Sequence, residues 1–133
     1  MIRYFAGSGK NFKEVESLED ASWVHVNGQD ELSQLERLTT ALGITTDYIT
    51  DPLDIEERAR YEKYDEARSI ILHTPVVNDG EKENDPIYIT VPLGIILCQQ
   101  KIITVCAMEN TVMEKFLDNK IKRFNPKNER LFI

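Results

Sequence analysis

The chain has 133 residues, the size of a single domain that can bury a hydrophobic core of its own. Its 23 acidic and 16 basic residues give a net charge of −7, which argues against nucleic acid as a partner because phosphate binding needs a basic surface. Hydrophobic residues make up 41% of the chain, as in ordinary globular domains, and no apolar run predicts a transmembrane helix or a signal peptide.

The first third of the chain predicts three strands and a helix. Short apolar runs at residues 2–5 and 12–15 flank a glycine-containing turn, which is the pattern of a β-hairpin. Residues 22–26 alternate well enough for a third strand. Leucines then recur at helical spacing between residues 32 and 42, and Gly43 supplies the signal that ends this helix.

Residues 43–66 form the most acidic stretch of the sequence. Within it, residues 46–50 predict one or two short turns. Asp51 followed by Pro52 predicts a helix N-cap with proline at the first helical position, and this pair would open a brief helix over residues 53–57.

Two interpretations of the acidic stretch remain open. Acidic runs are most often helix caps and solvated surfaces, but carboxylates can also converge on a hard cation such as Mg²⁺, which needs only one or two of them besides water. The regular loop of a calcium-binding EF-hand is missing, so a weak, partly hydrated Mg²⁺ site is the most that the stretch supports. Its carboxylates are Asp47, Asp51, Asp54, Glu56, Glu57, Glu62, Asp65 and Glu66.

The middle and later parts of the chain predict the rest of the sheet. Residues 60–64 have the pattern of an exposed strand or turn, and residues 67–77 predict a strand that Pro75 places near an edge or a bulge. Residues 87–98 and 102–108 are apolar on both faces. They predict a central hairpin that is covered on both sides.

The turn of this hairpin constrains the two cysteines. A turn at Gln99 and Gln100 pairs Cys98 with Lys101. Cys106 then lies too far along the partner strand for a disulfide, so we expect two buried, reduced thiols.

Two more segments complete the predicted domain. Residues 78–86 predict a solvent-exposed loop, and Thr111 with Glu114 resembles a capping box that opens a C-terminal helix. The elements together predict an α/β fold in a single domain over residues 1–133, with a mixed parallel and antiparallel sheet sandwiched by helices (α/β/α).

No enzymatic site is predicted. His25 and His73 both lie in predicted strands without a nucleophile nearby, and the sequence has no zinc-binding motif. A metal-dependent hydrolase is disfavoured as well, because no base or nucleophile accompanies the acids.

Six stretches of the chain carry a resemblance through their order and spacing: Trp23-Val24-His25-Val26, Leu42-Gly43-Ile44, Asp51-Pro52-Leu53-Asp54, the run from Glu57 to Asp65, and the strands at residues 87–97 and 103–106. Together they resemble the N-terminal cytoplasmic domain of the CorA family of Mg²⁺ transporters. The resemblance covers nearly the whole chain, although no single motif is diagnostic.

The resemblance implies an α/β/α domain. In family members this domain is followed by a stalk helix, two transmembrane helices and a GMN signature, and residues 1–133 contain none of these three features. Family members form homopentamers in the cell membrane, keep this domain on the cytoplasmic side, and pass Mg²⁺ or sometimes Co²⁺ and Ni²⁺. We therefore expect a cytoplasmic regulatory domain, truncated before the stalk, that is a monomer or weak dimer in isolation. The alternative is a freestanding soluble α/β module for interaction or ligand binding.

The resemblance also implies a metal site. In the family, an aspartate after the corresponding helix binds regulatory Mg²⁺ together with an acid on the stalk of the neighbouring subunit. Asp51 matches that position, with Asp54 and Asp47 as weaker candidates, and Thr50 stands where family members often carry glutamate. We expect structural ion pairs from three nearby charged residues, Arg58, Arg60 and Glu62.

Overall fold

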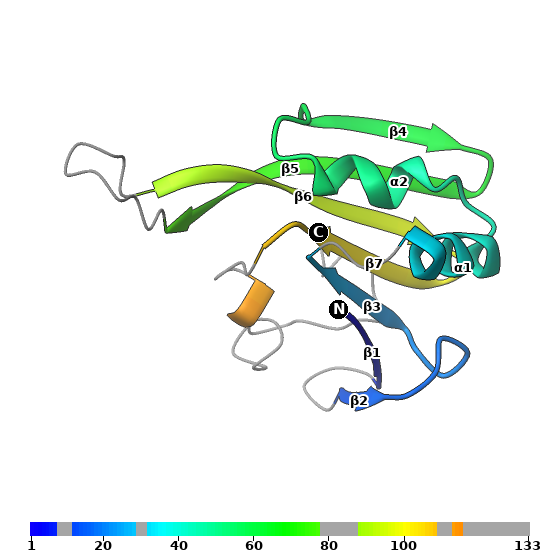
Figure 1. Ribbon diagram of the computed structural model, residues 1–133. Coiled ribbons are helices and arrows are strands. Elements are labelled where there is room, and N and C mark those ends of the chain that lie inside the picture. Colours follow the sequence, from blue (N-terminus) through cyan, green and yellow to red (C-terminus); the bar gives the residue numbers. More distant parts are fainter. Residues whose placement is uncertain (8–11, 29–31, 78–87, 109–112, 116–133) are drawn as a thin grey trace.

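Figure 1 shows the computed structural model, which describes residues 1–7, 12–28, 32–77, 88–108 and 113–115. The strands and helices are, in chain order, β1 (Ile2–Ala6), β2 (Lys13–Val15), β3 (Trp23–Asn27), α1 (Leu32–Leu42), α2 (Asp47–Thr50), the 3₁₀ helix η1 (Asp51–Leu53), β4 (Arg60–Tyr64), β5 (Ala67–Val77), β6 (Tyr88–Cys98) and β7 (Lys101–Cys106). Residues 113–115 form a further helical turn.

The strands form one seven-stranded sheet with the order β2-β1-β3-β7-β6-β5-β4. Neighbouring strands are antiparallel except β3 and β7, which are parallel and place Val24 opposite Ile103. After β3 the chain forms the helices and the β4-β5-β6 meander, and it then returns through β7 beside β3 (Figure 1). The predicted mixed sheet in a single α/β domain is confirmed.

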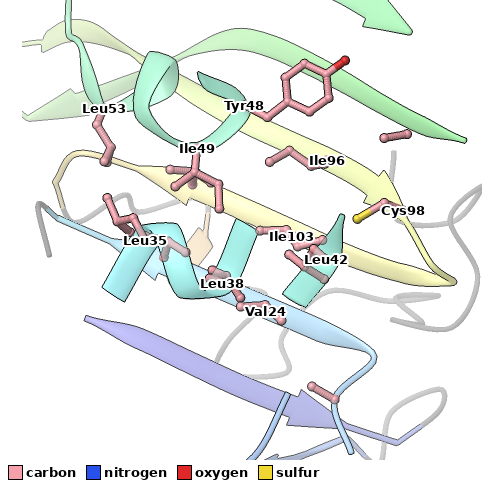
Figure 2. Packing of buried hydrophobic residues seen from close by; sticks show 14 residues of the cluster. Val24, Leu35, Leu38, Leu42, Tyr48, Ile49, Leu53, Ile96, Cys98 and Ile103 are labelled. Atoms are coloured by element: carbon pink, nitrogen blue, oxygen red, sulfur yellow. The ribbon is translucent and has the colours of Figure 1, made fainter. Parts of the chain in front are cut away.

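Apolar side chains pack on both faces of the sheet. On one face, Val24, Ile96 and Ile103 belong to a cluster with Leu38 of α1 and Ile49 of α2 (Figure 2). The buried residues on the other face are Phe5, Trp23, Leu93, Ile95, Leu97, Ile102, Cys106 and, from the helical turn, Met113. Successive side chains of β3, β6 and β7 point to opposite faces of the sheet, and both faces are buried. These strands are therefore apolar along their whole length.

The β6-β7 hairpin has the predicted register. Cys98 lies opposite Lys101, and the two residues between them form the turn. Gln99 and Gln100 both lie in the left-handed region, with φ of 48° and 60°. Cys98 and Cys106 are both buried, as predicted.

Helix α1 ends at Leu42, directly before Gly43, the residue that was predicted to stop it. Gly43 has a φ of 68°, a conformation that a residue without Cβ adopts readily. The side chain of Gln99 reaches this helix end, where its Nε2 donates to the backbone oxygen of Leu42 at 2.8 Å. The β6-β7 turn therefore satisfies one of the carbonyl groups that the end of α1 leaves unpaired.

The prediction that Asp51 caps a helix over residues 53–57 is wrong. Thr50 N donates to Thr46 O at 3.0 Å, and the amide of Asp51 donates to Asp47, so the chain is already helical before Asp51. Asp51 therefore ends α2 and begins η1, which stops at Asp54 in an extended conformation. An N-cap needs a non-helical residue at the start of a helix, and Asp51 has helical φ and ψ.

The predictions for the later strands are confirmed where the structure describes them. Residues 60–64 form β4, which pairs with residues 67–71 of β5. Pro75 lies beyond the end of β4, in a part of β5 that pairs with β6 alone among the described residues. This is an edge position, where a sheet tolerates proline. The predicted loop at residues 78–86 and the capping residue Thr111 lie outside the described residues.

Candidate functional site

The backbone at Asp51 is held by the packing of η1 on the sheet. Pro52 and Leu53 are buried, and Pro52 lies directly over Gly94 in β6. A Cβ atom added at Gly94 would stand 2.4 Å from Pro52 Cγ, well inside van der Waals contact. Glycine at this position thus lets η1 approach the sheet closely. This contact sets the backbone position from which the Asp51 side chain projects.

The side chain of Asp51 forms an ion pair with Arg60, the first residue of β4. Arg60 Nη2 lies 2.6 Å from Asp51 Oδ2, and Arg60 Nε lies 2.5 Å from Glu62 Oε1. Arg60 Nη1 donates to Glu57 Oε1, and it also lies 3.4 Å from the carbonyl oxygen of Arg58. One guanidinium thus gathers carboxylates from η1, from the loop after it and from β4, and we call these four residues the Arg60 cluster: Asp51, Glu57, Arg60 and Glu62.

The Arg60 cluster carries more negative than positive charge. Three carboxylates surround one guanidinium, which leaves two negative charges in excess. Burial raises the pKa of Asp51, Arg60 opposes this rise, and the nearby carboxylates of Glu57 and Asp47 add to it. The pKa of Arg60 is raised chiefly by its hydrogen bond to Glu62, so the guanidinium stays charged.

The loop between η1 and β4 is fixed by local hydrogen bonds. His73 on β5 places Nε2 2.8 Å from the carbonyl oxygen of Glu57, to which its N–H donates. The backbone amide of Arg58 donates to Glu57 Oε1, and this hydrogen bond is the largest cause of the lowered pKa of Glu57. The Glu57 carboxylate is therefore held facing Arg60.

The three predicted ligands occupy different positions. Asp51 is half-buried, with 33% of its side chain exposed, whereas Asp47 and Asp54 are exposed. Asp54 Oδ1 accepts a hydrogen bond from Glu56 N at 3.0 Å, so Asp54 stabilises its own turn. Among the described residues, no group of three or more His, Cys, Asp or Glu side chains is arranged to hold a metal ion.

The sequence predicted structural ion pairs from Arg58, Arg60 and Glu62, and in the structure Arg60 pairs with Glu62. It did not predict that Arg60 also binds Asp51 and Glu57. The available signal was the alternation in β4, which places Arg60 and Glu62 on the same face of the strand. Asp51 reaches that face because η1 lies beside β4 in the folded domain. No local sequence pattern predicts that these two elements are neighbours.

A second polar cluster lies inside the core. Trp23 Nε1 donates to Thr104 Oγ1 at 3.0 Å, and the same hydroxyl lies 2.7 Å from His25 Nδ1. Burial lowers the pKa of His25 to about 4, so the imidazole is neutral at physiological pH. With a hydrogen-bonded neutral ring and only 2% of its surface exposed, His25 has a structural role.

One surface hollow lies away from Asp51. It is an open depression of about 910 Å³ at the end of the sheet by the β6-β7 turn, and its lining includes Ser22, Glu66, Arg68 and Lys101. Lys101 Nζ donates to the carbonyl oxygen of Ala21 there. Asp51 does not line this depression, and its side chain is 33% exposed, so an ion or a second protein surface can reach it.

Comparison with known proteins identifies a family whose model matches the chain and solved structures that share its fold. The family model of the "CorA-like Mg2+ transporter protein" matches residues 19–132. The complete structure of the CorA magnesium transporter from Methanocaldococcus jannaschii is similar with a TM-score of 0.68 and 20% identity, over 89% of this chain and 36% of that chain. The structure of the soluble domain of CorA from the same organism gives a TM-score of 0.69 and 20% identity, over 99% of this chain and 50% of that chain.

The chain therefore spans half or less of the length of these structures. A search of curated proteins found no match. None of the helices in the described part of the chain combines the length and hydrophobicity needed to cross a bilayer.

Proposed function

This chain belongs to the CorA-like Mg²⁺ transporter family, and from that membership we propose that it is the cytoplasmic, Mg²⁺-sensing domain of a divalent-cation transporter. The match of the family to residues 19–132 carries the proposal. In the full-length protein, residues 1–133 precede a stalk and membrane helices, and neighbouring subunits of a homopentamer are the partners. Mg²⁺ is both regulator and cargo, with Co²⁺ and Ni²⁺ as further cargo, and the domain performs no enzymatic reaction.

Asp51 is the residue that we propose to bind the regulatory ion. Asp51 itself offers carboxylate oxygens, which are the ligands that Mg²⁺ prefers, and Arg60 holds two further carboxylates nearby. The guanidinium of Arg60 already neutralises Asp51 in part, so a positive charge fits this position. Asp51 supplies one carboxylate, which suffices for an ion that keeps most of its water.

The proposed mechanism is electrostatic. Carboxylates that face each other across a subunit boundary repel when no cation lies between them. A divalent ion bound between them favours the arrangement in which they are close, and this difference in affinity between two arrangements is what allows Mg²⁺ to shift the equilibrium. Because Pro52 packs directly on Gly94, the backbone that carries Asp51 is held in place for such a bridge.

A Mg²⁺ titration of the 133-residue chain followed by NMR tests the role of Asp51. At constant ionic strength we expect weak binding that shifts the carboxyl signal of Asp51, because the acid of the neighbouring subunit is not in this chain. A ligand present at ten times its dissociation constant stabilises a fold by about 1.4 kcal/mol, and we expect less here. The Asp51→Asn variant should lose the response, and the Asp54→Asn variant should keep it. A response that survives Asp51→Asn would refute the assignment.

The coding sequence after Ile133 separates this proposal from a freestanding α/β module. We expect two apolar runs of about 20 residues each, the length that crosses a bilayer, with Gly-Met-Asn between them. A stop codon directly after Ile133 would contradict the transporter and favour the freestanding module.

A further inference from the structure

Arg60 already holds a positive charge against Asp51. Its Nη2 lies 2.6 Å from Asp51 Oδ2, within the range of a strong charge-assisted hydrogen bond. Its other nitrogens are directed at Glu57 and Glu62, so the guanidinium lies between the three carboxylates of the Arg60 cluster. A divalent ion that approaches Asp51 meets a cation that is already bound.

We propose that Arg60 competes with the divalent cation for Asp51 and thereby sets the Mg²⁺ concentration to which the domain responds. The inference rests on the proposed function, since it takes Asp51 as the ligand. It adds a residue that controls the affinity without touching the metal.

Exchange between Arg60 and a divalent ion is compatible with the geometry of the cluster. The side chains of Arg60 and Asp51 are 30% and 33% exposed, so water and ions reach the pair. If Asp51 turns to a metal ion, Arg60 keeps its hydrogen bonds to Glu57 and Glu62. The guanidinium therefore stays hydrogen-bonded after it releases Asp51, which lowers the free energy needed for release.

The charge of the cluster favours a divalent ion over the guanidinium alone. Three carboxylates and one guanidinium leave two negative charges unbalanced, and two further charged residues nearby, Asp47 and Arg58, are of opposite sign to each other. One monovalent group cannot neutralise this charge, whereas a divalent ion matches the excess. The singly charged competitor weakens Mg²⁺ binding without abolishing it.

The repulsion between Arg60 and the bound ion predicts the size of the effect. Two charges on the metal and one on Arg60, about 5 Å apart in a dielectric close to that of water, weaken binding about tenfold. Replacing Arg60→Gln should therefore lower the dissociation constant for Mg²⁺ about tenfold. Arg60→Lys keeps the charge but loses the planar guanidinium that binds several carboxylates at once. We therefore expect this variant to lower the dissociation constant for Mg²⁺ by about two- to threefold.

The test is a Mg²⁺ titration of the wild-type chain and its variants by NMR at constant ionic strength. Arg37→Gln on α1 is the matched control, since it removes one positive charge from the surface beside β1, which four strands separate from β4, and it should leave the dissociation constant unchanged. In the wild type, Mg²⁺ should also shift the guanidinium signals of Arg60 together with the Asp51 carboxyl signal. This second readout needs no variant, so it does not depend on whether Arg60→Gln folds.

The possible outcomes distinguish the inference from the proposed function. Tighter binding in Arg60→Gln, with no change in Arg37→Gln, supports the competition. Binding that needs Asp51 but is unchanged or weaker in Arg60→Gln, or that leaves the guanidinium signals unmoved, overturns the competition and leaves the role of Asp51 intact. An absence of any response at Asp51, in both the wild type and Arg60→Gln, overturns both.

Discussion

Replacing Gly94 by alanine tests whether η1 depends on its close approach to the sheet. The new Cβ would stand 2.4 Å from Pro52 Cγ and 2.9 Å from Pro52 Cβ, whereas carbon atoms in contact normally lie about 3.5 to 4.0 Å apart. Pro52 would have to move by about 1 Å, because it is a ring on a buried 3₁₀ helix and cannot rotate away. Val105 Cβ, at 3.6 Å, would not be disturbed.

Overpacking of this kind destabilises a core by about 1 to 3 kcal/mol. Alanine in a strand recovers about 0.5 to 1 kcal/mol through its smaller entropy in the unfolded chain, so we expect Gly94→Ala to lower the free energy of unfolding by about 1 to 2 kcal/mol. Urea denaturation followed by circular dichroism measures this change. The ion pair between Asp51 and Arg60 should weaken as well, because η1 carries Asp51.

A double-mutant cycle shows whether the clash with Pro52 is the cause. Pro52→Gly removes both of the close atoms, so the pair of substitutions should be less destabilising than the sum of the two single effects by about 1 kcal/mol. The proposed close contact would be refuted if Gly94→Ala were as stable as the wild type. It would also be refuted if the effects of the two substitutions on the free energy of unfolding simply added.

Two further predictions concern stability. Because burial holds the pKa of folded His25 at about 4, below the 6.5 of the unfolded chain, the unfolded state binds more protons between these values. The neutral His25 therefore contributes to the free energy of unfolding above pH 6.5, and this contribution is lost as the pH falls toward 4. Between pH 7 and pH 5, the free energy of unfolding of the wild type, measured by urea titration, should fall by about 2 kcal/mol relative to that of His25→Gln. Gln100→Gly should stabilise the β6-β7 turn by about 1 kcal/mol, because glycine adopts a φ of 60° without strain; an unchanged or lower melting temperature would contradict this.

The elements that the sequence predicted well depend on neighbours along the chain. The leucines of α1 and the two-residue turn at Gln99 and Gln100 are local patterns, and both appear where they were expected. The error at Asp51 has a local cause too. An aspartate before a proline occurs both at the start of a helix and where an α-helix continues into a 3₁₀ turn, and the helical bond from Thr50 to Thr46 decides between them.

The parts of the site that the sequence did not predict depend on contacts between separate elements. Pro52 meets Gly94 because η1 crosses β6, and Asp51 meets Arg60 because β4 begins beside η1. Neither contact can be inferred before the order of strands in the sheet is known. Membership of the family was recognisable from order and spacing, but the pairing of Asp51 with Arg60 was not.

The single parallel pair in the sheet has a consequence for how the domain folds. β1, β2 and β3 form one antiparallel group, and β4, β5, β6 and β7 form another, each built from pairings of successive or nearly successive strands. Only β3 and β7 join the groups, and the bond between His25 and Thr104 across this seam links residues 79 positions apart. Closing so long a loop is slow compared with forming hairpins, so we expect the seam to form after the two antiparallel groups. The helical segment that carries Asp51 packs over β6 and β7, which both lie on one side of this seam, so this segment can reach its final position before the seam forms.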